Sequence, residues 1–174
     1  ALEVLAHEIG PHVYAPANMT QHLQLLAVIR QALPGSEQLA PLVANLYTDL
    51  LINQHLQRHT PCQMDAVYQR LKPTTATALW QLYMRIYERL WQLPPETLTS
   101  DPLGSSEDGD AWLGSRIIKV YGKDWLTGAS RFATLLLRYL QDDEQGANDA
   151  FGVLADTADA GTVPGDCQYA KTDD

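Results

Sequence analysis

Polar and hydrophobic positions of this chain alternate with the period of an α-helix, most clearly between residues 74 and 93. At about 100° per residue, the apolar side chains of this segment fall on one arc roughly 200° wide. A surface helix of a bundle usually needs an apolar stripe of only about 100°. We therefore predict that residues 74–93 form a central helix that neighbours bury on at least two sides. The polar strip left over is narrow and consists of Gln81, Arg85, Glu88 and Gln92, with Arg89 at its margin.

The same periodicity predicts further helices before and after the central one. The expected ranges are 1–9, 20–33, 36–59, a short helix that follows residue 60 and ends near residue 72, 111–121, 129–140, and a weak helix at 148–158. The faces of 20–33, 39–51 and 129–140 are narrower and could together cover the central helix. Strand alternation, hairpin turns and internal repeats are not evident in the sequence. We predict an all-α fold, a single bundle of about five to seven helices.

Candidate capping residues mark where several of these helices begin. Thr20 is a plausible N-cap for 20–33, and Thr74 or Thr75 for the central helix. The segment Thr60-Pro61-Cys62-Gln63 has the residue types of a capping box, with Thr as the N-cap and Pro at the first helical position. Pro94-Pro95 would end the central helix.

Charge divides the chain into a nearly neutral body and an acidic tail. Residues 1–140 carry 11 Lys and Arg against 12 Asp and Glu, whereas 141–174 carry Lys171 against nine acidic residues. The segment 96–110 adds a polar, acidic, Gly- and Ser-rich loop, which could be a seam within the bundle. We predict a helical bundle domain over 1–140 and an acidic tail with one weak helix over 141–174.

Hydropathy and cysteine usage favour a soluble, cytoplasmic chain. No apolar run approaches the roughly 20 residues of a membrane span, and no signal-peptide pattern begins the sequence. We therefore expect no membrane partner. Cys62 and Cys167 lie far apart and match no metal-binding spacing, so two free thiols are the favoured interpretation.

Histidines offer the main candidate for metal or haem chemistry. His7, His12, His22, His55 and His59 all fall in the first 60 residues. His55 and His59 are four positions apart, which would place two imidazoles on one helix face and suits a metal ion. They lie at the rim of the apolar face, where surface histidines are common, so we predict no metal site and no cofactor. A small metal- or haem-binding enzyme or sensor is an alternative function.

Catalytic motifs are sparse in this sequence. It contains no nucleophile elbow, no phosphate-binding GxxxxGK[ST] loop and no GxGxxG after a strand. Carboxylates cluster in the loop and tail rather than pairing on helix faces, as general acid–base catalysis would need. These features favour a protein that is not an enzyme.

A helix-turn-helix regulator is a further alternative. The short helix, the turn at Lys72-Pro73 and a second helix that presents Thr75, Thr77, Gln81 and Arg85 could dock in a major groove. The narrow polar strip of residues 74–93 opposes this interpretation.

Basic residues of the later helices suggest a different binding surface. Arg116, Lys119 and Lys123 fall opposite the apolar side of their helix, and Arg131 and Arg138 do so on the next one. Such faces could hold a phosphate backbone without reading bases, or they are ordinary solvated surfaces that the acidic tail screens. Stacking platforms are not expected, because the aromatic residues fall on the inner faces. We predict a non-catalytic helical subunit or domain of a larger assembly, with protein subunits and a nucleic-acid backbone as its partners.

Overall fold

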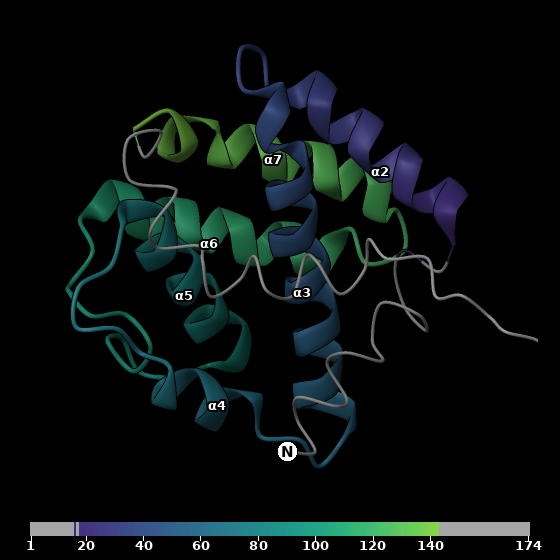
Figure 1. Cartoon of the computed structure of the whole chain (residues 1–174). Coiled ribbons are helices and arrows are strands. Elements are labelled where there is room, and N and C mark those ends of the chain that lie inside the picture. The colour runs from purple at the N-terminus through teal and green to yellow at the C-terminus, as the bar shows by residue number, and fades with distance from the viewer. Residues whose placement is uncertain (1–15, 17, 143–174) are drawn as a thin grey trace, which may run out of the picture.

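The computed structural model describes residue 16 and residues 18–142, and every regular element in that part of the chain is a helix (Figure 1). The elements are α2 (Met19–Ala32), the 3-10 helix η1 (Glu37–Leu39), α3 (Ala40–His59), α4 (Met64–Arg70), α5 (Ala78–Trp91), α6 (Ser105–Val120) and α7 (Trp125–Asp142). The all-α fold class is thereby confirmed. The expected helices at 1–9 and 148–158, and with them His7, His12 and Cys167, lie outside the described residues.

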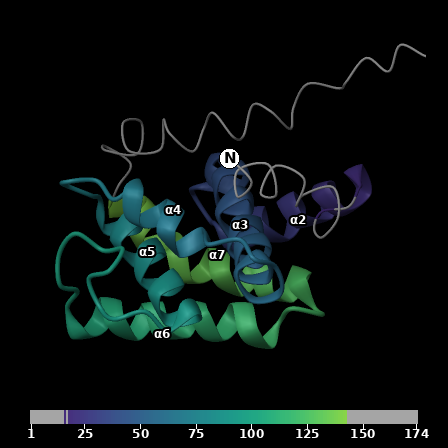
Figure 2. The same ribbon diagram turned by 90° about the horizontal axis from the view of Figure 1, so that it is seen from below.

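Helix α5 is buried by neighbours on several sides, as its wide apolar arc predicts. Nine of its fourteen residues are buried. Its main neighbours are α6, α3 and α7. The prediction that residues 20–33 help to cover it was wrong, because α2 packs mainly on α7 and α3. Figure 2 shows α6 running along the lower face of the bundle, beside α5.

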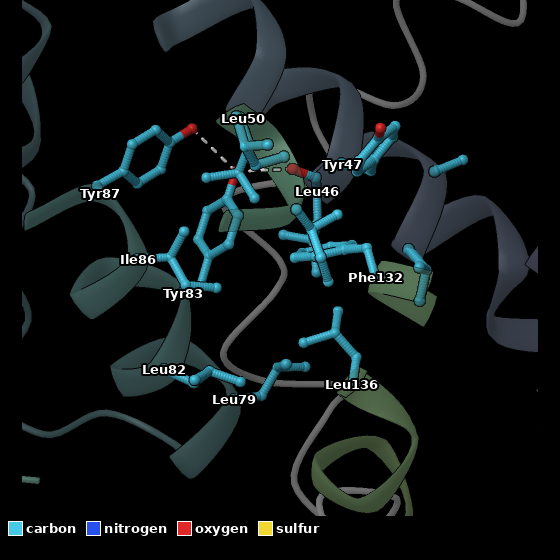
Figure 3. Packing of buried hydrophobic residues seen from close by; sticks show 14 of the residues in the cluster. Leu46, Tyr47, Leu50, Leu79, Leu82, Tyr83, Ile86, Tyr87, Phe132 and Leu136 are labelled. Atoms are coloured by element: carbon cyan, nitrogen blue, oxygen red, sulfur yellow. Dashed lines mark hydrogen bonds between the residues drawn. The ribbon is translucent and has the colours of Figure 1, made fainter. Parts of the chain in front are cut away.

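The core lies where α3, α5 and α7 meet (Figure 3). Leu46 and Leu50 of α3, Leu82 and Ile86 of α5 and Phe132 of α7 are all fully or almost fully buried there. No described helix is both long enough and apolar enough to cross a membrane.

Asn53 and three buried tyrosines form one hydrogen-bonded cluster in the core, in which the hydroxyls of Tyr83 and Tyr87 lie 3.0 Å apart. Asn53 Nδ2 donates to the hydroxyls of Tyr68 (3.0 Å) and Tyr87 (2.9 Å), and Tyr83 donates to the carbonyl of Leu46 (3.2 Å). Burial, together with the nearby charge of Asp49, raises the pKa of all three tyrosines well above the ordinary value. These tyrosines therefore serve as neutral structural groups that tie α3, α4 and α5 together.

The boundary between α3 and α4 differs from the sequence prediction, because Thr60 belongs to the end of α3 and a side chain of α3 caps α4. Thr60 ends α3 rather than beginning the next helix, since its hydroxyl donates to the Leu56 carbonyl (2.6 Å). The capping box at 60–63 was therefore wrong. The N-terminus of α4 is capped instead by Gln57 of α3, whose Oε1 accepts from the amides of Met64 (2.8 Å) and Asp65 (3.4 Å).

The ends of α2 and α5 lie close to the predicted positions, although different residues cap them. Asn18, rather than the expected Thr20, caps α2 by accepting from the Gln21 amide (3.0 Å). Thr77, rather than Thr74 or Thr75, caps α5 through the Trp80 amide (3.2 Å). At the other end Gln92 adopts a left-handed conformation (φ 59°), and the Leu93 amide donates to the Glu88 carbonyl (2.8 Å). This closing turn precedes Pro94-Pro95, as predicted.

Helix α6 begins inside the segment that the sequence marks as a loop. The prediction of irregular structure through residue 110 was wrong, because α6 starts at Ser105. Glu107 and Asp108 lie in its first turn, where negative charge favours a helix N-terminus. The rest of the segment folds onto α5, with Leu98 and Thr99 buried. Helix α7 likewise starts four residues before the predicted Ala129, at Trp125.

Glycine at position 114 sets how closely α6 approaches α5. A Cβ atom at Gly114 would lie 2.5 Å from Cδ1 of Ile86, which is far inside van der Waals contact. Since Ile86 is fully buried, the absence of a side chain at residue 114 lets the two helices pack side by side.

A candidate anion-binding cleft between α5 and α6

A cleft of about 410 Å³ opens between the C-terminal half of α5, the turn that follows it and α6. Four cationic side chains line it: Arg85 and Arg89 from α5, and Arg116 and Lys119 from α6. Both pairs are spaced so that their members share one face of their helix. The close approach at Gly114 brings the two faces together.

The cations of α5 are partly neutralised by the first turn of α6. Arg85 Nε donates to Asp108 Oδ1 (2.8 Å), and Arg89 binds the other oxygen of the same carboxylate. Burial alone would raise the pKa of Asp108, but the hydrogen bonds and charges of these two arginines hold that pKa below its ordinary value. Asp108 therefore stays ionised and orients both guanidinium groups along the cleft wall.

Glu88 lines the cleft and binds Arg85. Its side chain is fully buried, and Oε2 accepts from Arg85 Nη1 (2.9 Å). The other oxygen accepts from the amides of Leu98 (2.7 Å) and Thr99 (3.0 Å). Both oxygens are thus hydrogen-bonded, which is what makes burial of a carboxylate tolerable. Glu88 fastens residues 98 and 99 to α5 and fixes the position of Arg85.

The cations of α6 are much freer than those of α5. Arg116 and Lys119 are exposed, and neither forms a hydrogen bond or ion pair within residues 18–142. Arg116 lies over the ring of Trp112, with its guanidinium carbon 5.9 Å from the ring centroid. Trp112 also lines the cleft and is 53% exposed. The expectation that every aromatic residue faces inward was wrong at this position.

The other three predicted basic residues lie outside the cleft. Lys123 occupies the turn between α6 and α7, and Arg131 lies over the ring of Tyr121 at 5.2 Å. Arg138 forms an ion pair with Asp110 and donates to the Tyr139 hydroxyl (2.7 Å). Burial, and the hydrogen bond from Tyr139 to Asp110, raise the pKa of Tyr139 to about 12. Of the five predicted basic residues, two therefore line the cleft, Arg116 and Lys119. Lys123, Arg131 and Arg138 do not.

His55 and His59 lie close together near the C-terminal end of α3. The rings of His55 and His59 are 4.7 Å apart, and burial together with His59 lowers the pKa of His55. No group of three or more metal-ligating side chains gathers in the described part of the chain.

Three of the four polar side chains of the helix-turn-helix alternative are engaged within the protein. Gln81 is buried, where Oε1 accepts from the Ser100 amide (3.0 Å) and Nε2 donates to Asp101 (3.1 Å). With Thr77 in a cap and Arg85 bound to Asp108, these side chains are occupied by contacts within the chain.

The sequence did not predict Arg89 as a site residue, and it suggested Arg85 only for the helix-turn-helix alternative, although a signal for both was present. They are spaced four positions apart on the polar strip of an otherwise apolar helix. Nothing in the sequence indicated that α6 would lie against that strip. Comparisons with protein-family models, with curated proteins and with solved structures found no match to this chain. The fold and the site define an all-helical protein with a cationic cleft between two packed helices of its described part.

Proposed function

We propose that this chain is a non-catalytic helical subunit of a larger assembly, and that the cleft between α5 and α6 holds the phosphate backbone of a nucleic acid. The observation that carries the proposal is the convergence of four cations on one cleft, two of which have no carboxylate partner within residues 18–142. The whole chain has a formal net charge of -9, so this local concentration of positive charge is unusual for the protein. Such a concentration attracts an anionic ligand.

Phosphate groups suit this arrangement better than single carboxylates do. Guanidinium groups present several parallel donors that match phosphate oxygens, and a lysine adds a mobile point charge. Binding through backbone contacts positions a nucleic acid but carries no sequence information. The proposal is therefore one of sequence-independent binding that weakens as salt rises.

The groups around the cleft favour binding rather than catalysis. Glu88, the carboxylate that lines the cleft, has its oxygens occupied by Arg85 and by backbone amides. Ser115 lines the cleft too, but its hydroxyl donates to the Trp112 carbonyl (2.8 Å). Neither residue is hydrogen-bonded to a histidine or another base that could activate it. The cleft thus offers charge without an available proton acceptor.

The test is binding of a fluorescently labelled oligonucleotide, measured by anisotropy at several salt concentrations. Replacing Arg116 or Lys119 with Ala should weaken binding by about tenfold each, the loss expected for a charge-assisted hydrogen bond. The slope of log K against log salt should become shallower by roughly 0.7 to 0.9 for each phosphate that is no longer neutralised. The full chain is used throughout.

Arg30→Ala is the matched control, because Arg30 is an exposed arginine of α2 outside the cleft. It removes the same charge and should leave both the affinity and the salt slope close to those of the unmodified protein. Equal effects of Arg30→Ala and Arg116→Ala would contradict a site in the cleft, as would unchanged binding in the Arg116→Ala Lys119→Ala double variant.

A further inference from the structure

We propose that Trp112 is a stacking platform for a nucleobase, so that the cleft takes single-stranded nucleic acid in preference to duplex. This inference rests on the proposed phosphate binding at Arg116 and Lys119, and it adds the strandedness of the ligand. Trp112 is an exposed aromatic side chain that lines the cleft together with these two cations.

Trp112 differs from the other tryptophans of the described chain in its surroundings. Trp80, Trp91 and Trp125 are partly buried and pack against the hydrophobic core. Trp112 does not belong to that packed set and is 53% exposed. A large aromatic ring in water adds little to the stability of the fold, since the gain from an apolar side chain depends on the surface removed from water. Within the described residues the ring has the Arg116 guanidinium beside it and is otherwise largely open to solvent, so it is available to a ligand.

The spacing along α6 places the ring beside Arg116 and Lys119. Trp112, Arg116 and Lys119 are separated by four and three positions, which aligns them on one helix face along the cleft. The guanidinium of Arg116 lies 5.9 Å from the Trp112 ring centroid. A base that stacks on the indole would therefore place its own backbone phosphates within the reach of Arg116 and Lys119.

Strandedness follows from which bases have a free face. In a duplex the bases stack on one another inside the helix, whereas a single strand can turn a base out onto an aromatic side chain. Stacking accepts any base, because every base has a π-face. The cleft also offers only a short row of cations, so a ligand that adds stacking to a few phosphate contacts gains more there than a rigid duplex does.

The experiment compares the unmodified chain with Trp112→Ala on three labelled probes. They are a single-stranded oligothymidylate, an abasic strand of equal length, and a duplex of that length. Trp112→Ala should weaken binding of the oligothymidylate by about tenfold, the loss typical of one stacked base. Binding of the abasic strand and of the duplex should stay unchanged. Trp112→Phe, which keeps an aromatic face, should restore most of the affinity that Trp112→Ala removes.

The outcomes separate this inference from the proposed function. Equal weakening on the oligothymidylate and on the abasic strand would overturn the stacking role, as would no weakening on either. If Arg116→Ala still weakens binding in that case, phosphate binding stands. If none of the three probes binds the unmodified chain, both proposals fail. A urea unfolding midpoint for Trp112→Ala equal to that of the unmodified chain confirms that the variant is folded.

Discussion

Single residues decide whether the cleft exists, and Gly114 is the clearest of them. Because α6 lies against Ile86 at this point, the cations of α5 and α6 line the same cleft. A side chain at residue 114 would have to displace Ile86, which is fully buried and cannot swing into solvent. The glycine therefore stabilises the helix pair through the space that it leaves free.

Gly114→Ala should destabilise the protein by about 1–2 kcal/mol. Overpacking a core costs about 1–3 kcal/mol, and the better helix propensity of alanine returns up to about 1 kcal/mol. Gly109→Ala is the control in the same helix, because a Cβ there would meet nothing within 4 Å. It should stabilise by up to about 1 kcal/mol, since only the propensity gain applies. Urea unfolding followed by circular dichroism would measure both; a stabilised Gly114→Ala variant would contradict the close packing.

Helix ends show, at the scale of elements, what periodicity predicts and what it does not. The period of the hydrophobic pattern located α2, α3 and α5 to within a few residues, because burial of one face dominates where a helix forms. The start of α4 was assigned to the wrong residue. Its cap comes from Gln57, which belongs to α3 and lies seven residues before Met64. Such a cap depends on how α3 and α4 pack against each other, which the residues at the start of α4 do not reveal.

Gln57→Ala should loosen the start of α4. The amides of Met64 and Asp65 would no longer have their acceptor, and we expect a cost of about 1 kcal/mol, as for the removal of other N-caps. Hydrogen exchange at these two amides should speed up more than exchange in α5. Gln63→Ala is the control, because the side chain of this N-cap residue makes no capping bond. Equal exchange rates in the two variants would show that Gln57 does not act as the cap.

The start of α6 and the cleft share one reason for escaping prediction. Residues 105–110 have the composition of a loop, but Arg85 and Arg89 bind Asp108, and Arg138 binds Asp110. These ion pairs join segments that are distant in sequence. The sequence did identify Arg116 and Lys119 as a candidate basic face. It could not show that Arg85, Arg89 and the exposed Trp112 would line the same cleft, because that arrangement is a property of the packed helices.

At the scale of the whole molecule, the surface of α6 is unusual for the outside of a bundle. Of the six large hydrophobic side chains that the described chain exposes, Trp112, Leu113 and Val120 all belong to this helix. Isolated exposed hydrophobic residues are common on proteins, but several on one element favour a contact surface. The same helix carries Arg116 and Lys119, which line the cleft and have no carboxylate partner within residues 18–142. One helix thus presents both kinds of group that a subunit of a nucleoprotein assembly would use.

If the chain is such a subunit, its native mass should exceed the mass of one chain. The measurement is the size of the native protein in a gently prepared extract, before and after treatment with nuclease. A large species that persists after nuclease would support contacts with other protein subunits, because removal of nucleic acid would leave the protein contacts intact. A large species that falls to the mass of one chain would mean that nucleic acid alone holds the assembly together, against protein–protein contacts. A mass of one chain under both conditions would contradict the assembly altogether. The Arg116→Ala Lys119→Ala variant sharpens the result, since it should lose the nuclease-sensitive part of the mass and keep the rest.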